Sequence, residues 1–391
     1  MKELNNYKIL YLTQTYPFPA NDGGEQGLQT HVLELENSIY ADNIKMFFSL
    51  HNKPTYEVKP LKIDNRIFNI RKYKNILSKS VIEFFEFFLS RYSRSYNIID
   101  TKELRDAIRE YNPEIVILDH IGCYKALRAA KYNGKLIYIA HNIETEFNLG
   151  NARLQKNIIK KIIRYICALK AYCTERSVMK RADIIGCVSK SDYEIISKHY
   201  GNKTVLNNHV PKIENIEWNG SGYKTLFFCG PADFYPNKDA INWIINELAP
   251  KMPDIKFKIA GKNTEKINIK TSNVECFGFV SKDELINLYT TSSAFICPII
   301  YGSGIKMKLV EALGYYMPII ATENALEGLN MKLEPLINRN NLELTIKNIN
   351  TILNDQDGLI NYQKMIKTLV IKARTERVSL DNIIKMVIDI V

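Results

Sequence analysis

The sequence predicts an α/β protein of two domains, each a parallel sheet with helices on both faces. The chain has 391 residues, and single domains usually run to about 100–200 residues. Short apolar runs alternate with segments of helical periodicity along the whole chain, which is typical of parallel strands joined by helices. The alternation pauses near residues 210–222, where Asn, Gly and Ser accumulate. We therefore predict two Rossmann-like domains that meet near this segment.

The first half contains apolar runs that predict buried strands. Its expected strands are Tyr7–Thr13, Ile44–Phe48, Ile67–Ile70, Ile115–Leu118, Leu136–Ala140 and Arg181–Val188, and Val205–Pro211 closes this half. Its expected helices begin near Gln29–Leu35, cover Thr101–Tyr111 and start again at Ser189–Asp192. We assign residues 1–210 to the first domain.

The second half repeats the rhythm. Its expected strands are Lys224–Cys229, Ile255–Ala260, Val274–Phe277, Ala294–Pro298 and Pro318–Ala321, and its expected helices are Lys238–Leu248, Lys282–Thr290 and Ile305–Tyr315. We assign residues 211–370 to the second domain. Residues 371–391 are expected to form a final helix that packs back on the first domain.

Charge and cysteine content limit the function classes. The formal net charge is +11, which attracts phosphates, nucleic acid or anionic lipid. Nucleic-acid-binding motifs are absent from the sequence, so a phosphorylated substrate or an anionic membrane surface fits better. The seven cysteines form no CxxC pair, which indicates reduced thiols in a cytoplasmic protein. No signal peptide or membrane span is evident.

Two further segments are expected to form distinctive helices. Residues 76–92 interleave Phe and Leu with few charges, and residues 156–173 are basic and amphipathic. A basic amphipathic helix can lie on an anionic membrane, although most such helices pack on their own core.

The segment Pro298–Glu311, PIIYGSGIKMKLVE, is the strongest local feature. A strand ends, Gly302, Ser303 and Gly304 turn the chain, and a helix begins at Ile305. Unpaired N–H groups at a helix start favour anions, and glycines let a diphosphate approach the backbone. The cations of Lys306 and Lys308 add to this, and the Glu311 carboxylate could accept hydrogen bonds from two ribose hydroxyls. The alternative is a simple chain turn with surface lysines.

Three further loops follow predicted strands, where open α/β sheets bind ligands. One holds Gly230 and leads to Lys238, a possible phosphate contact. Another, Pro17–Gly27, contains Gly23 and Gly24, which could admit a ligand to the backbone. The third begins at His141, which could donate to a sugar hydroxyl. Since Asp119-His120 ends the neighbouring strand, two polar strand ends are expected side by side. Each loop could also be purely structural.

Several motifs are missing from the sequence. The first strand is not followed by G-x-G-x-x-G, which counts against an NAD enzyme of the usual kind, and no Walker A or H-E-x-x-H motif occurs. The one Asp-x-Asp, Asp355–Asp357, lies in a polar stretch that we interpret as turn chemistry rather than a metal site.

The second half resembles the retaining glycosyltransferases of family four, in the GT-B superfamily. The resemblance covers roughly residues 224–330, in the branch with Tyr-Pro-Asn and Gly-Ser-Gly donor loops. It rests on Phe228–Gly230, Tyr235–Asn237, Ile259–Gly261, Phe277–Val280, Gly302–Ala312, Met317-Pro318, Ala321-Thr322 and Glu327–Leu329. The first half agrees at Ala140–Glu144, Ala182-Asp183 with Val188-Ser189, and Leu206–Val210.

The resemblance implies a GT-B fold with two sheets facing a central cleft and a nucleotide-sugar donor site in the second domain. Lys306 would replace a phosphate-binding arginine, Lys308 would match an adjacent lysine, Glu311 would hold the ribose, and His141 would lie near the transferred sugar. The Gly23-Gly24 loop would face the donor phosphates and the acceptor.

Two positions depart from the family pattern. Ser303 replaces the first glutamate of a pair, and Pro231 replaces an arginine, which leaves open how the donor sugar's hydroxyls are recognised.

The expected function is transfer of a hexose-type sugar from a nucleotide-diphosphate sugar to a glycan or lipid-linked acceptor, with retention, in bacterial surface polysaccharide synthesis. No metal and no cofactor are expected, because the helix start and its lysines could stabilise the departing diphosphate. The expected location is the cytoplasm or the inner face of the plasma membrane. A GT-B nucleotide-sugar epimerase and a non-catalytic GT-B partner subunit remain alternatives.

Overall fold

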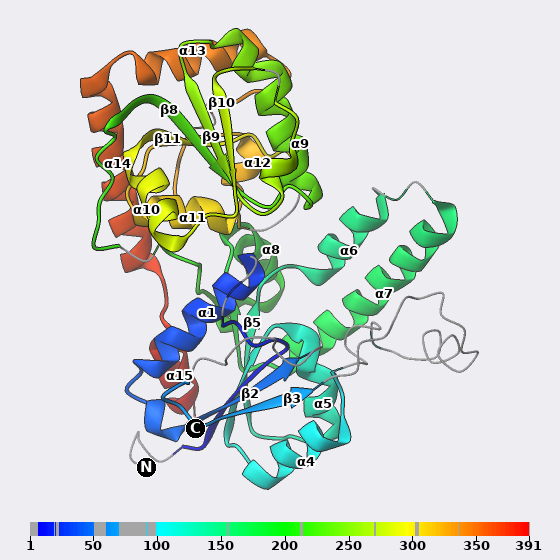
Figure 1. The fold of residues 1–391 in the computed structure, drawn as a ribbon. Helices are drawn as coiled ribbons and strands as arrows, with labels where there is room; N and C mark the ends of the chain where they lie inside the picture. The colour runs from blue at the N-terminus through cyan, green and yellow to red at the C-terminus, as the bar shows by residue number, and fades with distance from the viewer. Residues whose placement is uncertain are drawn as a thin grey trace. The chain divides into compact units, whose positions relative to one another are not determined.

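The computed structural model describes residues 7–18, 20, 23–50, 60–69, 92, 99–153, 155, 157–211, 214–269, 271–301, 305–334 and 336–390. The chain forms two compact units (Figure 1). Unit 1 comprises Met1–Asn208 together with Val378–Val391, and unit 2 comprises His209–Arg377.

Unit 1 contains a seven-stranded parallel sheet in the order β3-β2-β1-β4-β5-β6-β7. Each strand pairs in parallel with its neighbours, and Leu118 of β4 lies opposite Tyr138 of β5. Its strands are β1 (Ile9–Thr13), β2 (Ile44–Leu50), β3 (Asn65–Asn69), β4 (Ile115–Asp119), β5 (Lys135–Ala140), β6 (Ile184–Cys187) and β7 (Thr204–Leu206).

Helices cover both faces of this sheet. Successive strand side chains alternate between faces, so Leu10 and Leu12 join one apolar core while Ile9 and Tyr11 join the other. Both faces are therefore buried, as the uninterrupted apolar runs predicted. The helices are α1 (Gly23–Glu36), α4 (Lys102–Tyr111), α5 (Tyr124–Ala129), α6 (Glu144–Arg153), α7 (Ile158–Arg181), α8 (Lys190–Tyr200) and α15 (Leu380–Ile388).

The last helix, α15, belongs to unit 1. Ile383, Ile384 and Val387 are buried against the same core as Ile9 and Tyr11. The backbone N–H of Leu380 donates to the Glu34 carboxylate on α1 at 2.8 Å. The single helix expected over 371–391 is wrong in its start, because residues up to Glu376 continue α14 and α15 begins only at Leu380.

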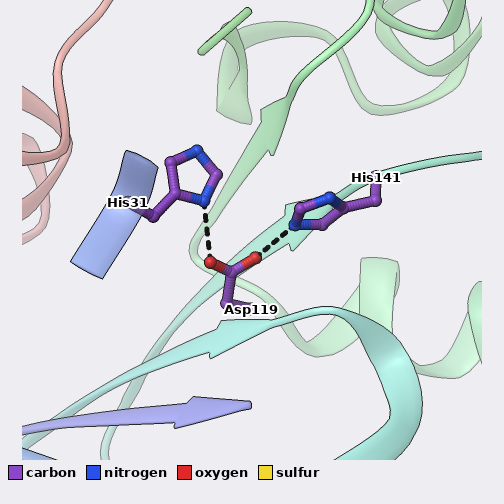
Figure 2. Close-up of side chains that lie close together, drawn as sticks. All are labelled: His31, Asp119 and His141. Atoms are coloured by element: carbon purple, nitrogen blue, oxygen red, sulfur yellow. Dashed lines mark hydrogen bonds and ion pairs between the residues drawn. The ribbon is translucent and has the colours of Figure 1, made fainter. Parts of the chain in front are cut away.

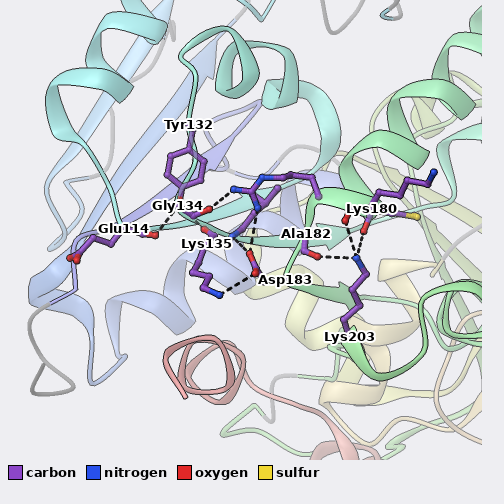
Figure 3. A network of polar contacts seen from close by, with 11 residues as sticks. Glu114, Tyr132, Gly134, Lys135, Lys180, Ala182, Asp183 and Lys203 are labelled. Carbon is purple, nitrogen blue, oxygen red and sulfur yellow. Dashed lines mark hydrogen bonds and ion pairs between the residues drawn. The ribbon is translucent and has the colours of Figure 1, made fainter. Parts of the chain in front are cut away.

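A polar network at the amino-terminal edge of the sheet anchors the end of α7 (Figure 3). The Lys203 ammonium donates to the carbonyls of Met179 and Ala182 at 2.7 and 3.0 Å, where the helix dipole is negative. The Asp183 carboxylate accepts from the Leu136 N–H at 2.8 Å and pairs with Arg181. The carboxyl end of α7 is therefore fixed to β5 and β7.

Unit 2 contains a five-stranded parallel sheet in the order β10-β9-β8-β11-β12, around one apolar core. Its strands are β8 (Gly222–Cys229), β9 (Lys256–Ala260), β10 (Val274–Gly278), β11 (Ser292–Cys297) and β12 (Ile319–Ala321). Its helices are α9 (Tyr235–Trp243), α10 (Lys282–Thr291), α11 (Met307–Gly314), α12 (Glu323–Leu326), α13 (Leu342–Leu353) and α14 (Gln356–Glu376).

Local sequence signals explain several helix starts. Ser281 and Glu284 form a capping box at α10, and the side chains of Thr101 and Ser189 cap α4 and α8. Asp355 stands at the N-cap position of α14, and Asp357 lies in its first turn. The Asp-x-Asp sequence thus marks the start of α14, just after α13 ends.

Two predicted elements have different bounds. Gly23 and Gly24 belong to the first turn of α1 rather than to a loop that runs to Gly27, because the helix hydrogen bonding begins at Gly23 despite the low helix propensity of glycine. The predicted α9 starts earlier, at Tyr235, with Pro236 in its first turn, where proline loses no hydrogen bond. The helix expected over 76–92 lies outside the described residues except for Tyr92.

Candidate active site

Two groups of polar side chains gather at the carboxyl ends of strands, one in each unit. In unit 1, Asp119 ends β4, and His141 follows the neighbouring strand β5. One Asp119 oxygen lies 2.5 Å from Nε2 of His141, and the other lies 2.7 Å from Nδ1 of His31 on α1 (Figure 2). The prediction that the polar ends of these two strands lie side by side is confirmed.

The Asp119 carboxylate is fully buried and accepts a third hydrogen bond, from the Tyr11 hydroxyl at 2.6 Å. Burial alone would raise the pKa of Asp119, but the two imidazoles and their hydrogen bonds outweigh it and hold that pKa well below its ordinary value. An ionised carboxylate only accepts hydrogen bonds, so the facing ring nitrogens of His31 and His141 both carry hydrogen. Asp119 therefore orients His141 at the strand end.

His120, between Asp119 and the next turn, has an unusual backbone. Its φ is 74°, a conformation that costs energy for a residue with a Cβ. Its ring stacks on His141 at 5.4 Å between centroids, and its Nε2 lies 3.5 Å from the Glu144 carboxylate. Burial and the neighbouring His141 lower the pKa of His120 to about 3, so this imidazole is neutral at physiological pH.

The same cluster holds the ligand types of a transition-metal site. Potential ligand atoms of His31, Asp119 and His141 lie within 4.8 Å of one another. Ligands that share one Zn²⁺ at about 2.0–2.2 Å would stand roughly 3 Å or more apart. Each imidazole nitrogen instead lies 2.5–2.7 Å from a carboxylate oxygen, which is hydrogen-bond geometry.

In unit 2, the ends of β8 and β9 approach each other closely. The Gly230 N–H donates to the Ala260 carbonyl at 2.8 Å, and a Cβ added at Gly261 would stand 2.3 Å from the Gly230 carbonyl oxygen. Gly261 also has a φ of 139°, which side chains rarely adopt. A Cβ on Gly230 would stand 2.6 Å from Nζ of Lys308. Because Gly230 and Gly261 have no Cβ, the ends of β8 and β9 and the Lys308 ammonium can approach one another closely.

Lys308, in the first turn of α11, is held at this point. Its ammonium donates to Oδ1 of Asn237 on α9 at 2.5 Å, and Nδ2 of Asn237 donates to the Pro231 carbonyl at 3.1 Å. The ammonium also lies 4.5 Å from the centre of the Phe228 ring. Burial lowers the pKa of Lys308 from its ordinary value. The amide and the ring therefore fix the position of a partly desolvated cation.

Lys306 stands at the N-cap position of α11, which begins two residues later than Ile305, the predicted start. Burial is the largest cause that lowers the pKa of Lys306, and Lys308 adds to it, while Glu327 opposes it. Ile305 packs partly buried against the unit 2 core. Gly302, Ser303 and Gly304, the predicted donor loop, lie outside the described residues.

Glu311 is the fifth residue of α11, one turn into the helix rather than two. Its Oε2 accepts a hydrogen bond from the Tyr289 hydroxyl at 3.0 Å. Burial raises the pKa of Glu311, and the Tyr289 hydrogen bond partly offsets this. The carboxylate is thus oriented from α10, with one oxygen engaged within the protein.

The other predicted site residues have different surroundings. Lys238 is exposed on α9, and Gly24 is exposed on α1. The structure therefore brings together Gly230, Lys306, Lys308 and Glu311 within unit 2, whereas Gly23, Gly24 and His141 belong to unit 1.

Sequence reasoning missed His31 and Tyr289 and did not pair Asn237 with Lys308. His31 contacts Asp119 across 88 positions of sequence, and Lys308 contacts Asn237 across 71. No local spacing signals such pairs. The sequence indicates that Asp119 ends a strand and could therefore contact a polar residue on an adjacent helix. It does not indicate which residue of that helix makes the contact.

Known proteins match a large part of the second unit and, at lower identity, about two thirds or more of the chain. Residues 223–355 match the family model described as glycosyl transferases group 1. A Haemophilus influenzae protein described as an uncharacterized glycosyltransferase is 24% identical over 269 residues, covering 66% of this chain and 71% of that protein. A 44.6 kDa protein of the Klebsiella pneumoniae cps region is 23% identical over 350 residues, covering 82% and 84%.

Solved structures agree along nearly the full length. TarM of S. aureus superposes with a TM-score of 0.65 at 10% identity, covering 98% of this chain and 99% of that one. Anabaena HepE, in complex with UDP and glucose, gives a TM-score of 0.60 at 13% identity with the same coverage. The chain has the GT-B fold. The fold and the match of residues 223–355 to glycosyl transferases group 1 together support the conclusion that the chain is a glycosyltransferase of the GT-B type.

Proposed function

We propose that this GT-B chain transfers a hexose-type sugar from a nucleotide-diphosphate sugar to a glycan or lipid-linked acceptor, with retention and without a metal ion at the reaction centre. The observation that carries the proposal is the pair Lys306 and Lys308 at the start of α11, within the segment that matches glycosyl transferases group 1, with the Lys308 ammonium beside Gly230. HepE, a structural neighbour, holds UDP and glucose, which supports a donor of this class.

The two lysines would stabilise the leaving group. Negative charge grows on the phosphate oxygens as the bond to the sugar breaks, and fixed cations in a partly desolvated site stabilise it most effectively. Lys308 is already held by Asn237, so little reorganisation is needed when charge develops. Gly230 leaves space at the Lys308 ammonium that a Cβ would fill. These residues would perform the neutralisation for which other transferases use a divalent cation.

Glu311 would hold the ribose through the carboxylate that Tyr289 orients. The Glu311 carboxylate is partly buried and partly desolvated, so hydrogen bonds from sugar hydroxyls would restore contacts that water supplies to an exposed carboxylate. His141, oriented by Asp119, would contact a hydroxyl of the transferred sugar. Lys238, Gly23, Gly24 and the segment Gly302–Ile305 would complete the donor contacts.

Two comparisons support a role in bacterial surface polysaccharide synthesis. One relative is encoded in a cps region, and the lipopolysaccharide outer core galactosyltransferase WaaB shares the fold. We place the reaction in the cytoplasm, at the inner face of the plasma membrane, where a lipid-linked acceptor would be available. None of the helices in the described part of the chain combines the length and apolar character needed to cross a bilayer.

The test is product formation from a panel of UDP-, GDP-, CMP- and dTDP-sugars, with bacterial lipid extract as the acceptor source and EDTA present. The proposal predicts release of nucleoside diphosphate only when acceptor is added, and an unchanged anomeric configuration by NMR. Conversion of the donor sugar without acceptor would instead identify an epimerase. Nucleotide binding without any turnover would favour a partner subunit.

A further inference from the structure

Helix α7 carries a row of exposed apolar side chains along one face. Ile158, Ile162, Tyr165, Leu169 and Tyr172 follow one another at spacings of four and three residues, so they line up on one side of the helix. Each is exposed, with relative exposures of 67% at Ile158 and 64% at Leu169. We call these five residues the α7 stripe. At 1.5 Å per residue it is roughly 20 Å long.

The opposite side of α7 holds the helix to unit 1. Its buried residues begin only at Cys167 and continue to Met179, and the Lys203 contacts fix its carboxyl end (Figure 3). No residue from Ile158 to Ile166 is buried, although five of these nine residues are isoleucine. Helix α6 lies beside α7 in the same unit (Figure 1). The stripe thus faces away from the side through which α7 packs.

The exposed charges that α7 itself carries have one sign. Lys161 flanks the row, three residues after Ile158 and four before Tyr165, and Arg176 and Lys180 continue the same face beyond Tyr172, whereas Lys160 and Arg164 lie toward the other side of the helix. The one acidic residue of α7, Glu175, is buried and accepts hydrogen bonds from Glu144 and Thr145 of α6. A second copy of this surface would bring cations against cations, which is unfavourable. An apolar row between cations instead complements a surface that is apolar inside and anionic outside.

We propose that the α7 stripe docks on an anionic lipid bilayer. The helix would lie in the plane of the interface, with the isoleucines and Leu169 among the acyl chains. Tyr165 and Tyr172 would sit at headgroup depth, where amphipathic aromatic rings are favoured. The Lys and Arg ammonium and guanidinium groups would reach the lipid phosphates while their methylenes cover apolar surface. The docking gives the proposed transferase a defined membrane contact. The proposed function supplies the reason for the docking, whereas the docking itself is argued from α7 alone.

Vesicle flotation of the full-length protein tests the docking. The vesicles contain phosphatidylcholine alone or with phosphatidylglycerol, and no nucleotide or sugar is added. We expect flotation with the anionic vesicles, and a loss of about tenfold or more in the partition coefficient for the double variant Ile162→Gln/Leu169→Gln. Lys161→Gln/Arg176→Gln, which removes two cations beside the stripe, should weaken anionic binding and its salt dependence.

The matched control is Ile371→Gln, because Ile371 is 48% exposed on α14 in unit 2 and should not change flotation. Circular dichroism and thermal unfolding confirm that each variant is folded. Absence of flotation for the wild type, or equal flotation of the stripe variant, would overturn the proposal. So would a dimer in sedimentation velocity that the stripe variant abolishes, since the occupant would then be a second copy. Nucleotide binding measured on the same proteins reports separately on the transferase proposal.

Discussion

Nε2 of His141 lies 2.5 Å from one carboxylate oxygen of Asp119, at the ends of neighbouring strands. The other Asp119 oxygen accepts a hydrogen bond from Nδ1 of His31. One buried carboxylate therefore orients two imidazoles. Removing its charge leaves a buried N–H group without a matching acceptor, because an amide offers one oxygen and one NH₂ group.

We expect Asp119→Asn to lower the free energy of unfolding by about 3 kcal/mol or more, the usual cost of breaking a buried charged pair. Urea unfolding measures it. The control is Asp64→Asn, because Asp64 pairs with Lys45 at the surface with its side chain 67% exposed, and such pairs contribute roughly 1 kcal/mol at most. Equal effects of the two substitutions would contradict the orienting role of Asp119.

His120 should resist protonation in the folded protein. Its pKa is lowered to about 3 by burial and by His141, whereas the unfolded chain titrates near the ordinary value of 6.5. The unfolded state thus binds more protons between these values, so this residue makes stability fall as pH drops from about 6.5 toward 3. His120→Asn should remove that contribution.

Imidazole NMR titration between pH 8 and 4 checks this prediction, with the His120 signal assigned by its loss in the variant. The expected result is no titration of His120 above pH 5. A midpoint between pH 6 and 7 would show that the ring is solvated and that its environment does not favour the neutral form.

Gly261→Ala should destabilise unit 2. The new Cβ would stand 2.3 Å from the Gly230 carbonyl oxygen, and the φ of 139° is strained for alanine. We expect a loss of roughly 2 kcal/mol or more in unfolding free energy and weaker nucleotide binding. Gly150→Ala is the matched control, since nothing lies within 4 Å of its added Cβ and helix α6 should gain up to about 1 kcal/mol. Similar stability of both variants would contradict the close approach.

The fold and its strand ends could be predicted from the sequence because both depend on local patterns. Buried parallel strands are continuous apolar runs, so the runs themselves place Asp119 and His141 at the ends of neighbouring strands. The long-range partners could not be predicted. His31 and Tyr289 lie on helices, and helical periodicity indicates only which face of a helix is buried. Which polar group that face contacts depends on the packing of the whole unit. The Gly23–Gly27 segment misled because glycine favours loops, yet the helix already begins there.

The most direct test of the central claim is calorimetric titration of the same nucleotide-sugar panel in EDTA, for wild type, Glu311→Ala and the control Glu343→Ala. Glu343 is exposed in the first turn of α13. We predict that one nucleotide binds the wild type in EDTA, that Glu311→Ala weakens binding by about tenfold or more through loss of hydrogen bonds to the carboxylate, and that the control does not. Absence of binding by every nucleotide, or equal binding by wild type and Glu311→Ala, would contradict a donor site at the start of α11.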